Sequence, residues 1–225
     1  NTEGEPTAKC LIFVTPDAQR SMNTFLGAST ELRPSDISKD FIGRSKILYL
    51  EGYLWDPPNA KKAFLEAINI AKAADTKVAL SLSDAFCVDR YRSEFLDLVR
   101  THVDILFGNE TELLSLYQVE NLNEAIGLVQ DDCEIVAVTR DSRGSIVIEN
   151  KRVFEIAAQK IDTVIDTTGA GDLYASGFLY GITRDMDIRQ CGRLGGLVAS
   201  SIITQFGARP EESLMPLIDR VAVSN

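Results

Sequence analysis

The sequence predicts an α/β fold in which helices lie on both faces of a mostly parallel sheet. Short apolar strand patterns alternate with helical patterns between residues 47 and 139. This order is typical of parallel strands joined by helical crossovers. A glycine-rich segment near residue 170 then opens directly into another helical pattern. The 225 residues are enough for one compact domain that buries roughly 70% of its unfolded surface.

The first elements are a hairpin and a short helix. Residues 9–14 and 20–25 have strand patterns, and the segment Thr15-Pro16-Asp17-Ala18-Gln19 between them has the composition of a turn. These features predict a β-hairpin. A short helix is expected over residues 34–42, beginning at Pro34-Ser35-Asp36.

The core elements follow from hydrophobic periodicity. Strands are expected over residues 47–50, 78–82, 103–107, 135–139 and 145–149. Helices are expected over residues 59–74, 90–100, 109–117, 122–129 and 187–206, and over a segment whose apolar stripe is Leu173, Phe178, Leu179 and Ile182. Ligands of open α/β sheets bind at the carboxyl ends of the strands. Three polar groups emerge there, namely Glu51-Gly52, Ser83-Asp84 and Asn109.

Composition excludes several classes of protein. The net charge of −10, from 33 acidic and 23 basic residues, opposes a nucleic-acid surface. The strongest apolar run, residues 194–203, is shorter than the roughly 20 residues that a membrane span needs. Cys10, Cys87, Cys133 and Cys191 are far apart in sequence and are interpreted as reduced, mostly buried thiols of a cytoplasmic protein. His102 is the only histidine, which excludes a multi-histidine metal site.

The segment Asp166-Thr167-Thr168-Gly169-Ala170-Gly171-Asp172 carries the predicted chemistry. Glycine at 169 and 171 allows a tight turn and a close approach of the backbone to a ligand. The first N–H groups of the following helix have no partner inside the helix and, with the helix dipole, favour an anion such as phosphate. An ionised Asp172 beside them could accept a proton from a substrate hydroxyl. The alternative is an ordinary helix N-terminus with favoured cap residues.

Two other glycine-rich phosphate motifs do not fit. No Gly-Lys-Ser/Thr occurs, so the P-loop pattern is absent. A dinucleotide fingerprint would need glycine where Tyr174 stands. The seven residues 166–172 instead resemble the D-T-x-G-A-G-D signature of the ribokinase (PfkB-type) family of carbohydrate and nucleoside kinases.

This resemblance implies a ribokinase-like, three-layer α/β/α fold. Residues 1–30 would form a β-hairpin region, with its hairpin at residues 9–25, beside the lid and the substrate pocket, and residues 31–225 would form the nucleotide-binding kinase core. Family members usually carry a first βαβ region, a sugar-binding glycine motif and much of the lid before this point. We therefore expect that the N-terminal third of the family's chain is absent from this one.

The resemblance also implies a magnesium and nucleotide site. Asn109 and Glu112 match the family's N-x-x-E element, which orders Mg²⁺ through water, although the same residues would form a helix capping box. Thr139 and Gly144 match a segment that lines the nucleotide, with Asp141 where glycine is usual. A plain hairpin turn is the alternative for that segment.

Two further assignments come from the resemblance. Glycines inside residues 187–206 each cost about 1 kcal/mol relative to alanine, which indicates close helix packing or room for an adenine ring. By resemblance Gly195 contacts adenine. Asp166, Thr168 and Gly207 would bind a monovalent cation, K⁺, through backbone oxygens.

The predicted function is an ATP- and Mg²⁺-dependent phosphotransferase acting on a primary hydroxyl, with adenosine converted to AMP. Asp172 is the base, and the N–H groups of Gly169, Ala170 and Gly171 form the anion hole. Adenosine is preferred because residues 22–28 and 51–58 resemble bacterial adenosine-kinase-like members. The alternatives are a fructokinase or ribokinase-type sugar kinase and a non-catalytic nucleotide-binding fragment. The partner is a small molecule, and a homodimer is left open.

Overall fold

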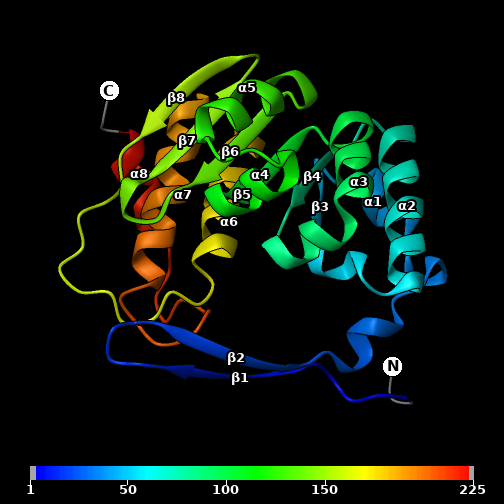
Figure 1. Ribbon diagram of the computed structural model, residues 1–225, viewed down its shortest axis with the longest axis horizontal. Helices are drawn as coiled ribbons and strands as arrows, with labels where there is room; N and C mark the ends of the chain where they lie inside the picture. Colours follow the sequence, from blue (N-terminus) through cyan, green and yellow to red (C-terminus); the bar gives the residue numbers. More distant parts are fainter. Residues whose placement is uncertain (1–3, 223–225) are drawn as a thin grey trace. The chain divides into compact units, whose positions relative to one another are not determined.

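The computed structural model describes residues 4–222 and confirms the predicted α/β class (Figure 1). Six strands form a mixed sheet in the order β3-β4-β5-β6-β7-β8, flanked by helices. Strand β6 (Ile135–Thr139) has the predicted bounds. Strands β3 to β5 pair in parallel, and β7 and β8 are antiparallel. The bounds of these five strands are β3 Ile47–Glu51, β4 Lys77–Ser81, β5 Ile105–Asn109, β7 Ser145–Glu149 and β8 Arg152–Ile156.

The chain divides into two compact units. The first consists of Thr24–Val136 with the N-terminal residues through Cys10, and the second of Leu11–Asn23 with the chain from Ala137 onward. The division into residues 1–30 and 31–225 that the sequence suggests stays a prediction. Its outer ends, residues 1–3 and 223–225, lie outside the described residues.

The predicted hairpin is confirmed with its predicted bounds. Strands β1 (Lys9–Val14) and β2 (Arg20–Phe25) form a separate two-stranded sheet. The Thr15 N–H donates to the Gln19 carbonyl (2.8 Å), and Ala18 takes a positive φ of 60°, so the backbone reverses within the predicted turn. The membership of this hairpin in a lid stays a prediction.

Helices alternate with the parallel strands of the first unit, as the periodicity predicts. They are α2 (Pro58–Ala73), α3 (Ala85–Thr101), α4 (Glu110–Tyr117) and α5 (Leu122–Asp132). Proline at the start of α2 suits the first helical turn, where an N–H would lack a partner. Asp84 caps α3 by accepting a hydrogen bond from the Phe86 N–H (2.6 Å). The core of this unit includes the fully buried side chains Ile68, Leu80, Leu82, Phe95, Ile105, Leu106, Leu113 and Leu116.

The expected single helix over residues 34–42 is wrong. The chain instead forms short 3₁₀ turns at Gly27–Glu31 and Pro34–Asp36, and then helix α1 (Lys39–Gly43). Ile37 and Ser38 between the last two are extended. The Ser38 hydroxyl accepts a hydrogen bond from the Phe41 N–H (3.4 Å), so this serine starts a new helix rather than continuing the first.

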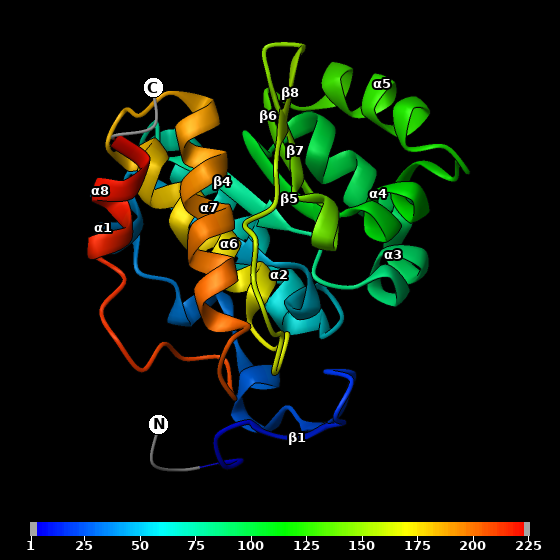
Figure 2. The same cartoon turned by 90° about the vertical axis from the view of Figure 1, so that its left-hand side faces the viewer.

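Glycines allow the helices of the second unit to pack closely. Helices α6 (Ala170–Thr183) and α7 (Ile188–Ile202) lie side by side in both views (Figures 1 and 2). A Cβ at Gly177 would lie 2.9 Å from the Leu194 carbonyl oxygen. A Cβ at Gly181 would lie 2.7 Å from Cys191 Sγ. Any larger residue would therefore separate the two helices.

Two expectations about these helices need correction. Helix α7 ends at Ile202 rather than residue 206, because the Ile203 carbonyl accepts a hydrogen bond from the Ile165 N–H (2.8 Å) in the preceding loop. The buried face of α6 also differs from the predicted apolar stripe. Of that stripe only Phe178 is fully buried, and the face consists of Tyr174, Ala175, Gly177, Phe178 and Gly181.

Strand β8 and helix α8 (Pro216–Ala222) were not predicted. Strand β8 follows a turn in which Asn150 and Lys151 both have positive φ, 48° and 66°. Asparagine is typical of such a turn but lysine is not, so the hairpin signal is weak. Helix α8 is only seven residues long, which leaves little periodicity to detect.

The cysteines agree with the expectation of reduced thiols but are not all buried. All four cysteines are free, and Cys133 and Cys191 are buried. Cys10 is exposed, unlike the expected buried thiol, because it lies on the hairpin. Between residues 4 and 222 we find no helix that is both long and apolar enough to span a membrane.

Candidate active site

The loop that leads into α6 is organised by the buried carboxylate of Asp166, which is 2% exposed. Its Oδ1 accepts hydrogen bonds from the Thr168 N–H (2.9 Å) and hydroxyl (2.6 Å), and its Oδ2 accepts one from the Gly207 N–H (2.9 Å). Burial alone would raise the pKa of Asp166. The hydrogen bonds from Thr168 and Gly207, with the nearby charge of Arg20, outweigh burial and hold the pKa below its usual value.

A residue that the sequence does not single out also contacts this loop. The guanidinium of Arg20, on β2, donates a hydrogen bond to the hydroxyl of Thr167. The two residues are far apart in sequence, and an exposed arginine in a strand carries no signal for such a contact. The hairpin segment of the second unit is therefore joined directly to the glycine loop.

Gly169 has a conformation and a neighbour that both require glycine. Its φ is +80°, and it is the N-cap residue of α6. A Cβ at Gly169 would lie 2.8 Å from the Cβ of Ala208. Gly171, by contrast, has no atom within 4 Å of a Cβ placed there. The backbone at Gly171 is therefore open to a ligand.

The first turn of α6 carries unpaired donors. The Ala170 N–H donates to the Thr167 carbonyl (3.2 Å), so one of the three predicted anion-hole donors is already engaged. In the described part of the chain, the N–H groups of Gly171 and Asp172 have no acceptor, and no side chain caps the helix. Such donors at the positive end of a helix dipole favour a bound anion.

Asp172 lies in that first turn, and its side chain is exposed. The sequence predicts that the helix field favours the ionised carboxylate. In the structure, partial desolvation raises the pKa of Asp172 above its usual value. A carboxylate with a raised pKa is a stronger base, which suits proton removal from a hydroxyl.

The predicted magnesium residues lie in the first unit and bind each other. The Asn109 side chain accepts a hydrogen bond from the Glu112 N–H (2.8 Å), and the two Glu112 carboxylate oxygens accept hydrogen bonds from the Asn109 N–H (2.9 Å) and Nδ2 (2.8 Å). This is the capping box that the sequence offers as the alternative to a magnesium role. Burial raises the pKa of Glu112 to about 7, helped by the nearby charges of Asp84 and Glu51 and opposed by the Asn109 N–H.

Glu51 and Ser83 meet at the carboxyl ends of β3 and β4, as expected for parallel neighbours. The Ser83 hydroxyl donates to Glu51 Oε2 (2.7 Å), and the Tyr49 hydroxyl donates to Glu51 Oε1 (2.6 Å). Ser83 has a positive φ of 67°. Their strand-end positions predict these two residues as polar groups near a ligand, although no motif includes them.

These donor sets allow only an indirect role toward a divalent ion. Residues 4–222 contain no group of three or more His, Cys, Asp or Glu side chains arranged to hold a metal. Both carboxylate oxygens of Glu112 are engaged, so Asn109 and Glu112 fit a magnesium ion bound through its own waters better than direct ligation. Asp166, Thr168 and Gly207 lie together because the Asp166 carboxylate accepts hydrogen bonds from the other two residues, and the backbone carbonyl oxygens of the three stay the predicted ligands of a cation.

Of the two predicted nucleotide-lining residues, Gly144 has a packing explanation. Thr139 ends β6, and Gly144 has a φ of +83° with its missing Cβ position 2.0 Å from the Ile156 carbonyl oxygen. Asp141, where the resembled family usually has glycine, also has a positive φ, 50°. Glycine is therefore required at 144 by the neighbouring strand, and the contact with a nucleotide stays a prediction.

Gly195 is explained by helix packing. A Cβ there would lie 2.8 Å from the Tyr174 carbonyl oxygen, so of the two reasons for the helix glycines the structure supports close packing at this position. Gly196, which the sequence analysis did not select, has open space around its missing Cβ. Gly196 is therefore the glycine of α7 that leaves room for a ligand.

The structure thus joins some predicted residues and separates others by unit. Asp166, Thr168, Gly169, Asp172 and Gly207 belong to one connected loop and turn of the second unit. Asn109 and Glu112 form a separate pair in the first unit.

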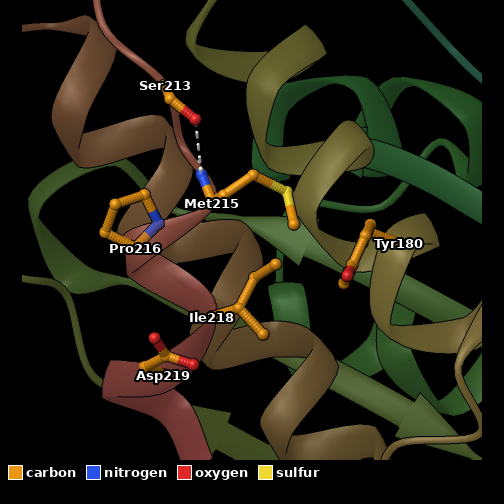
Figure 3. A pocket seen from close by; sticks show the side chains of 6 residues that line it. All are labelled: Tyr180, Ser213, Met215, Pro216, Ile218 and Asp219. Atoms are coloured by element: carbon orange, nitrogen blue, oxygen red, sulfur yellow. Dashed lines mark hydrogen bonds between the residues drawn. The ribbon is translucent and has the colours of Figure 1, made fainter.

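An open cavity of about 540 Å³ lies elsewhere in the second unit (Figure 3). Tyr180 of α6 faces Met215 and Ile218 across it, and Ser213, Pro216 and Asp219 complete its lining. Tyr180 is eight residues beyond Asp172, about 12 Å along the helix at 1.5 Å per residue. The cavity is therefore distinct from the start of α6.

Comparison with known proteins identifies the relatives of this chain. The family model described as "pfkB family carbohydrate kinase" matches residues 1–214. A solved probable sugar kinase from Rhizobium etli CFN 42 is 48% identical, with a TM-score of 0.94 over 96% of this chain and 66% of that chain. An adenosine kinase from Sinorhizobium meliloti is also 48% identical, with a TM-score of 0.93 over 96% of this chain and 67% of that chain.

A curated relative, a 5-dehydro-2-deoxygluconokinase from Listeria monocytogenes serovar 1/2a, is 29% identical over 201 residues, which are 86% of this chain and 61% of the relative. This chain spans about two thirds of the length of the two solved relatives. Their folds confirm the ribokinase-like architecture implied by the signature at residues 166–172. The family match over nearly the whole chain shows that this protein belongs to the pfkB family of carbohydrate kinases.

Proposed function

We propose that this chain carries the phosphoryl-transfer machinery of an ATP-dependent kinase whose acceptor is the primary hydroxyl of a nucleoside, converting adenosine to AMP. The observation that carries the proposal is the start of α6. Gly169 turns the chain, the Gly171 and Asp172 N–H groups lack acceptors, and the Asp172 carboxylate lies in the same turn. The 48% identity to an adenosine kinase supports the choice of acceptor.

The chemistry follows from these groups. The Asp172 carboxylate accepts the proton of the acceptor hydroxyl as that oxygen bonds to the γ-phosphorus of ATP. The bond from the γ-phosphorus to the β–γ bridging oxygen breaks, and ADP leaves with the electron pair. Unpaired N–H groups at Gly171 and Asp172 stabilise the negative charge on the transferring phosphoryl oxygens. When bound, Mg²⁺ neutralises phosphate charge, and Asn109 and Glu112 would order its waters.

The remaining assignments belong to the same proposal. Thr139 and Gly144 would border the nucleotide, and Gly195 with its open neighbour Gly196 would border the adenine ring. Backbone oxygens of Asp166, Thr168 and Gly207 would hold a potassium ion, because the buried Asp166 carboxylate brings these residues together. A sugar acceptor is the second candidate, supported by the probable sugar kinase that is equally identical to this chain.

A coupled ADP-release assay with adenosine, fructose and ribose tests the proposal. We expect turnover to be fastest with adenosine. Asp172→Asn keeps the size of the side chain but removes the base, so kcat should fall about 100- to 10,000-fold. Asp162→Ala, which changes an exposed aspartate of the preceding loop, is the matched control and should leave kcat unchanged.

Three outcomes would count against the proposal in different ways. Faster turnover of fructose or ribose would replace adenosine by a sugar acceptor. A kcat for Asp172→Asn within about tenfold of the parent would remove the base assignment. ATP binding without turnover of any acceptor would favour a non-catalytic nucleotide-binding chain.

A further inference from the structure

The turn that follows α7 is closed by one side chain, that of Gln205. Its Nε2 donates a hydrogen bond to the Arg209 carbonyl (2.8 Å), and its Oε1 accepts one from the Glu211 N–H (3.3 Å). Residues 203–211 form no helix or strand. Among the described residues, Gln205 supplies the only side-chain hydrogen bonds that span this turn.

The same turn forms one wall of the glycine loop. The Gly207 N–H donates to the buried Asp166 carboxylate (2.9 Å), and Gly207 has a positive φ of 86°. Ala208 lies so close to Gly169 that a Cβ at Gly169 would be 2.8 Å from the Cβ of Ala208 and 3.0 Å from its Cα. The position of the turn therefore limits the conformations that Gly169 can adopt.

We propose that Gln205 is a positioning residue for the phosphate-binding loop of this kinase. Its amide fixes the span from residue 205 to residue 211, which holds Gly207 on Asp166 and Ala208 against Gly169. The Gly169 carbonyl in turn accepts a hydrogen bond from the Leu173 N–H (2.9 Å). Leu173 lies in the first turn of α6, which also carries Asp172. The effect of Gln205 on catalysis rests on the proposed function, whereas its effect on the structure of the loop does not.

The chemistry of glutamine suits this task. An amide offers a donor and an acceptor at once, so a single side chain can bond a carbonyl and an N–H on opposite sides of the turn. Alanine removes both bonds. Glutamate keeps the acceptor for the Glu211 N–H but loses the donor to the Arg209 carbonyl. Gln205→Glu should therefore give a smaller effect in the same direction as Gln205→Ala.

Amide hydrogen exchange, read residue by residue with NMR spectroscopy on the whole chain, tests directly whether Gln205 holds the turn and the phosphate-binding loop in place. The reporters are the N–H groups of Thr168, Ala170, Leu173 and Gly207, which are hydrogen-bonded in the loop, the turn and the first turn of α6. In Gln205→Ala their exchange should be about five- to tenfold faster, as expected when a bond of ordinary strength is lost. Exchange of strand β7 is the internal reference, and Gln190→Ala on α7 is the matched control.

Kinetics with the preferred acceptor provide the second reading. If the chain turns over, Gln205→Ala should lower kcat about tenfold while the acceptor KM stays within about twofold, because the loop contacts the moving phosphoryl group rather than the acceptor. Absence of turnover in the parent chain would refute the proposed function, but the exchange experiment would still decide whether Gln205 positions the loop.

Two results would overturn the proposal. One is unchanged exchange at the four reporters in a folded Gln205→Ala variant. The other is faster exchange in β7 to the same extent as in the loop, since that pattern means a general loss of stability. If Gln205→Ala does not fold, Gln205→Glu is judged by the same two criteria.

Discussion

At the scale of single residues, the two buried carboxylates of the candidate site have opposite electrostatics. Asp166 is surrounded by donors, and its pKa lies below the usual value, whereas Glu112 is buried near other acids and its pKa rises to about 7. Burial is the main reason for the raised pKa of Glu112, and the charges of Asp84 and Glu51 add to it. At Asp166 three hydrogen bonds and the charge of Arg20 outweigh burial and favour the ionised carboxylate.

Glu112 should make the protein less stable as the pH rises from about 4.5 to about 7. Its usual pKa is 4.5 and its folded value is about 7, so in this range the folded state binds more protons than the unfolded state. The loss is at most about 3 kcal/mol, from 1.36 kcal/mol per pKa unit. Glu112→Gln should flatten this dependence in urea unfolding measured at pH 5 and pH 8 without divalent ions.

The exposed glutamate of α5, changed in Glu124→Gln, is the matched control for that measurement. This variant should keep the pH dependence of the parent. A Glu112→Gln protein that still lost stability between pH 5 and pH 8 as the parent does would show that another group titrates.

Asp166 should affect stability in the opposite direction. Because its pKa is lowered in the folded state, its contribution to the free energy of unfolding is present above its ordinary pKa of 3.8 and is lost as the pH falls through the folded value. Asp166→Asn places an amide where a charged acceptor is needed and should lower the free energy of unfolding by about 2 kcal/mol at pH 7. Thermal unfolding at pH 7 and pH 3 measures this cost, which should shrink at the lower pH. An equal cost at both values would contradict the electrostatic explanation.

The residues that could be identified from residue types alone are those whose role is local, whereas Gly207, which bonds to Asp166 from far along the chain, came only from the family resemblance. Gly169, Gly171 and Asp172 are adjacent in sequence, and the turn, the donors and the acid can be inferred from residue types alone. Arg20 and Gln205 could not be found in this way. Arg20 contacts Thr167 across most of the chain, and the role of Gln205 depends on where the turn after α7 lies.

At the scale of elements, close packing of α6 on α7 explains why the second unit tolerates so many helical glycines. Gly177, Gly181 and Gly195 each face the backbone or Cβ of the partner helix at short distance. The loss of helix propensity at these positions, about 1 kcal/mol each, is offset by the contact between the two helices. This pair of helices fixes where the start of α6, and therefore Asp172, lies in the second unit.

Adjacent glycines of α7 provide a matched test of this packing. Gly195→Ala would place a methyl group 2.8 Å from the Tyr174 carbonyl oxygen and should destabilise the fold by about 1 to 3 kcal/mol. Gly196→Ala meets no atom within 4 Å and should stabilise the helix by up to about 1 kcal/mol. Urea unfolding compares the two variants. Equal effects would mean that the α6–α7 contact does not constrain Gly195.

The elements that the sequence misjudged share a physical cause. The segment 34–42 was expected to be one helix, but the hydroxyl of Ser38 caps a separate helix and divides it. The end of α7 was placed four residues late because the competing hydrogen bond from Ile165 to the Ile203 carbonyl comes from a distant loop. In both cases a polar contact, rather than hydrophobic periodicity, determines where the helix begins or ends. Elsewhere the periodicity located the strands of the sheet and the helices that flank it.

At the scale of the whole molecule, family membership and activity rest on different grounds. The match over residues 1–214 and the similarity of the solved relatives establish the family and the fold. The acceptor follows from neither, since a probable sugar kinase and an adenosine kinase are both 48% identical to this chain. The chemistry common to both names is transfer of a phosphoryl group to a hydroxyl, and we propose that the start of α6 serves that step.

A crystal structure of the chain with adenosine and the non-hydrolysable β–γ imido analogue of ATP would test this account most directly. The account predicts that the terminal phosphate accepts hydrogen bonds from the N–H groups of Gly171 and Asp172, with the acceptor hydroxyl of adenosine on the Asp172 carboxylate. A triphosphate bound away from the N-terminus of α6, with these two N–H groups still unpaired, would contradict it.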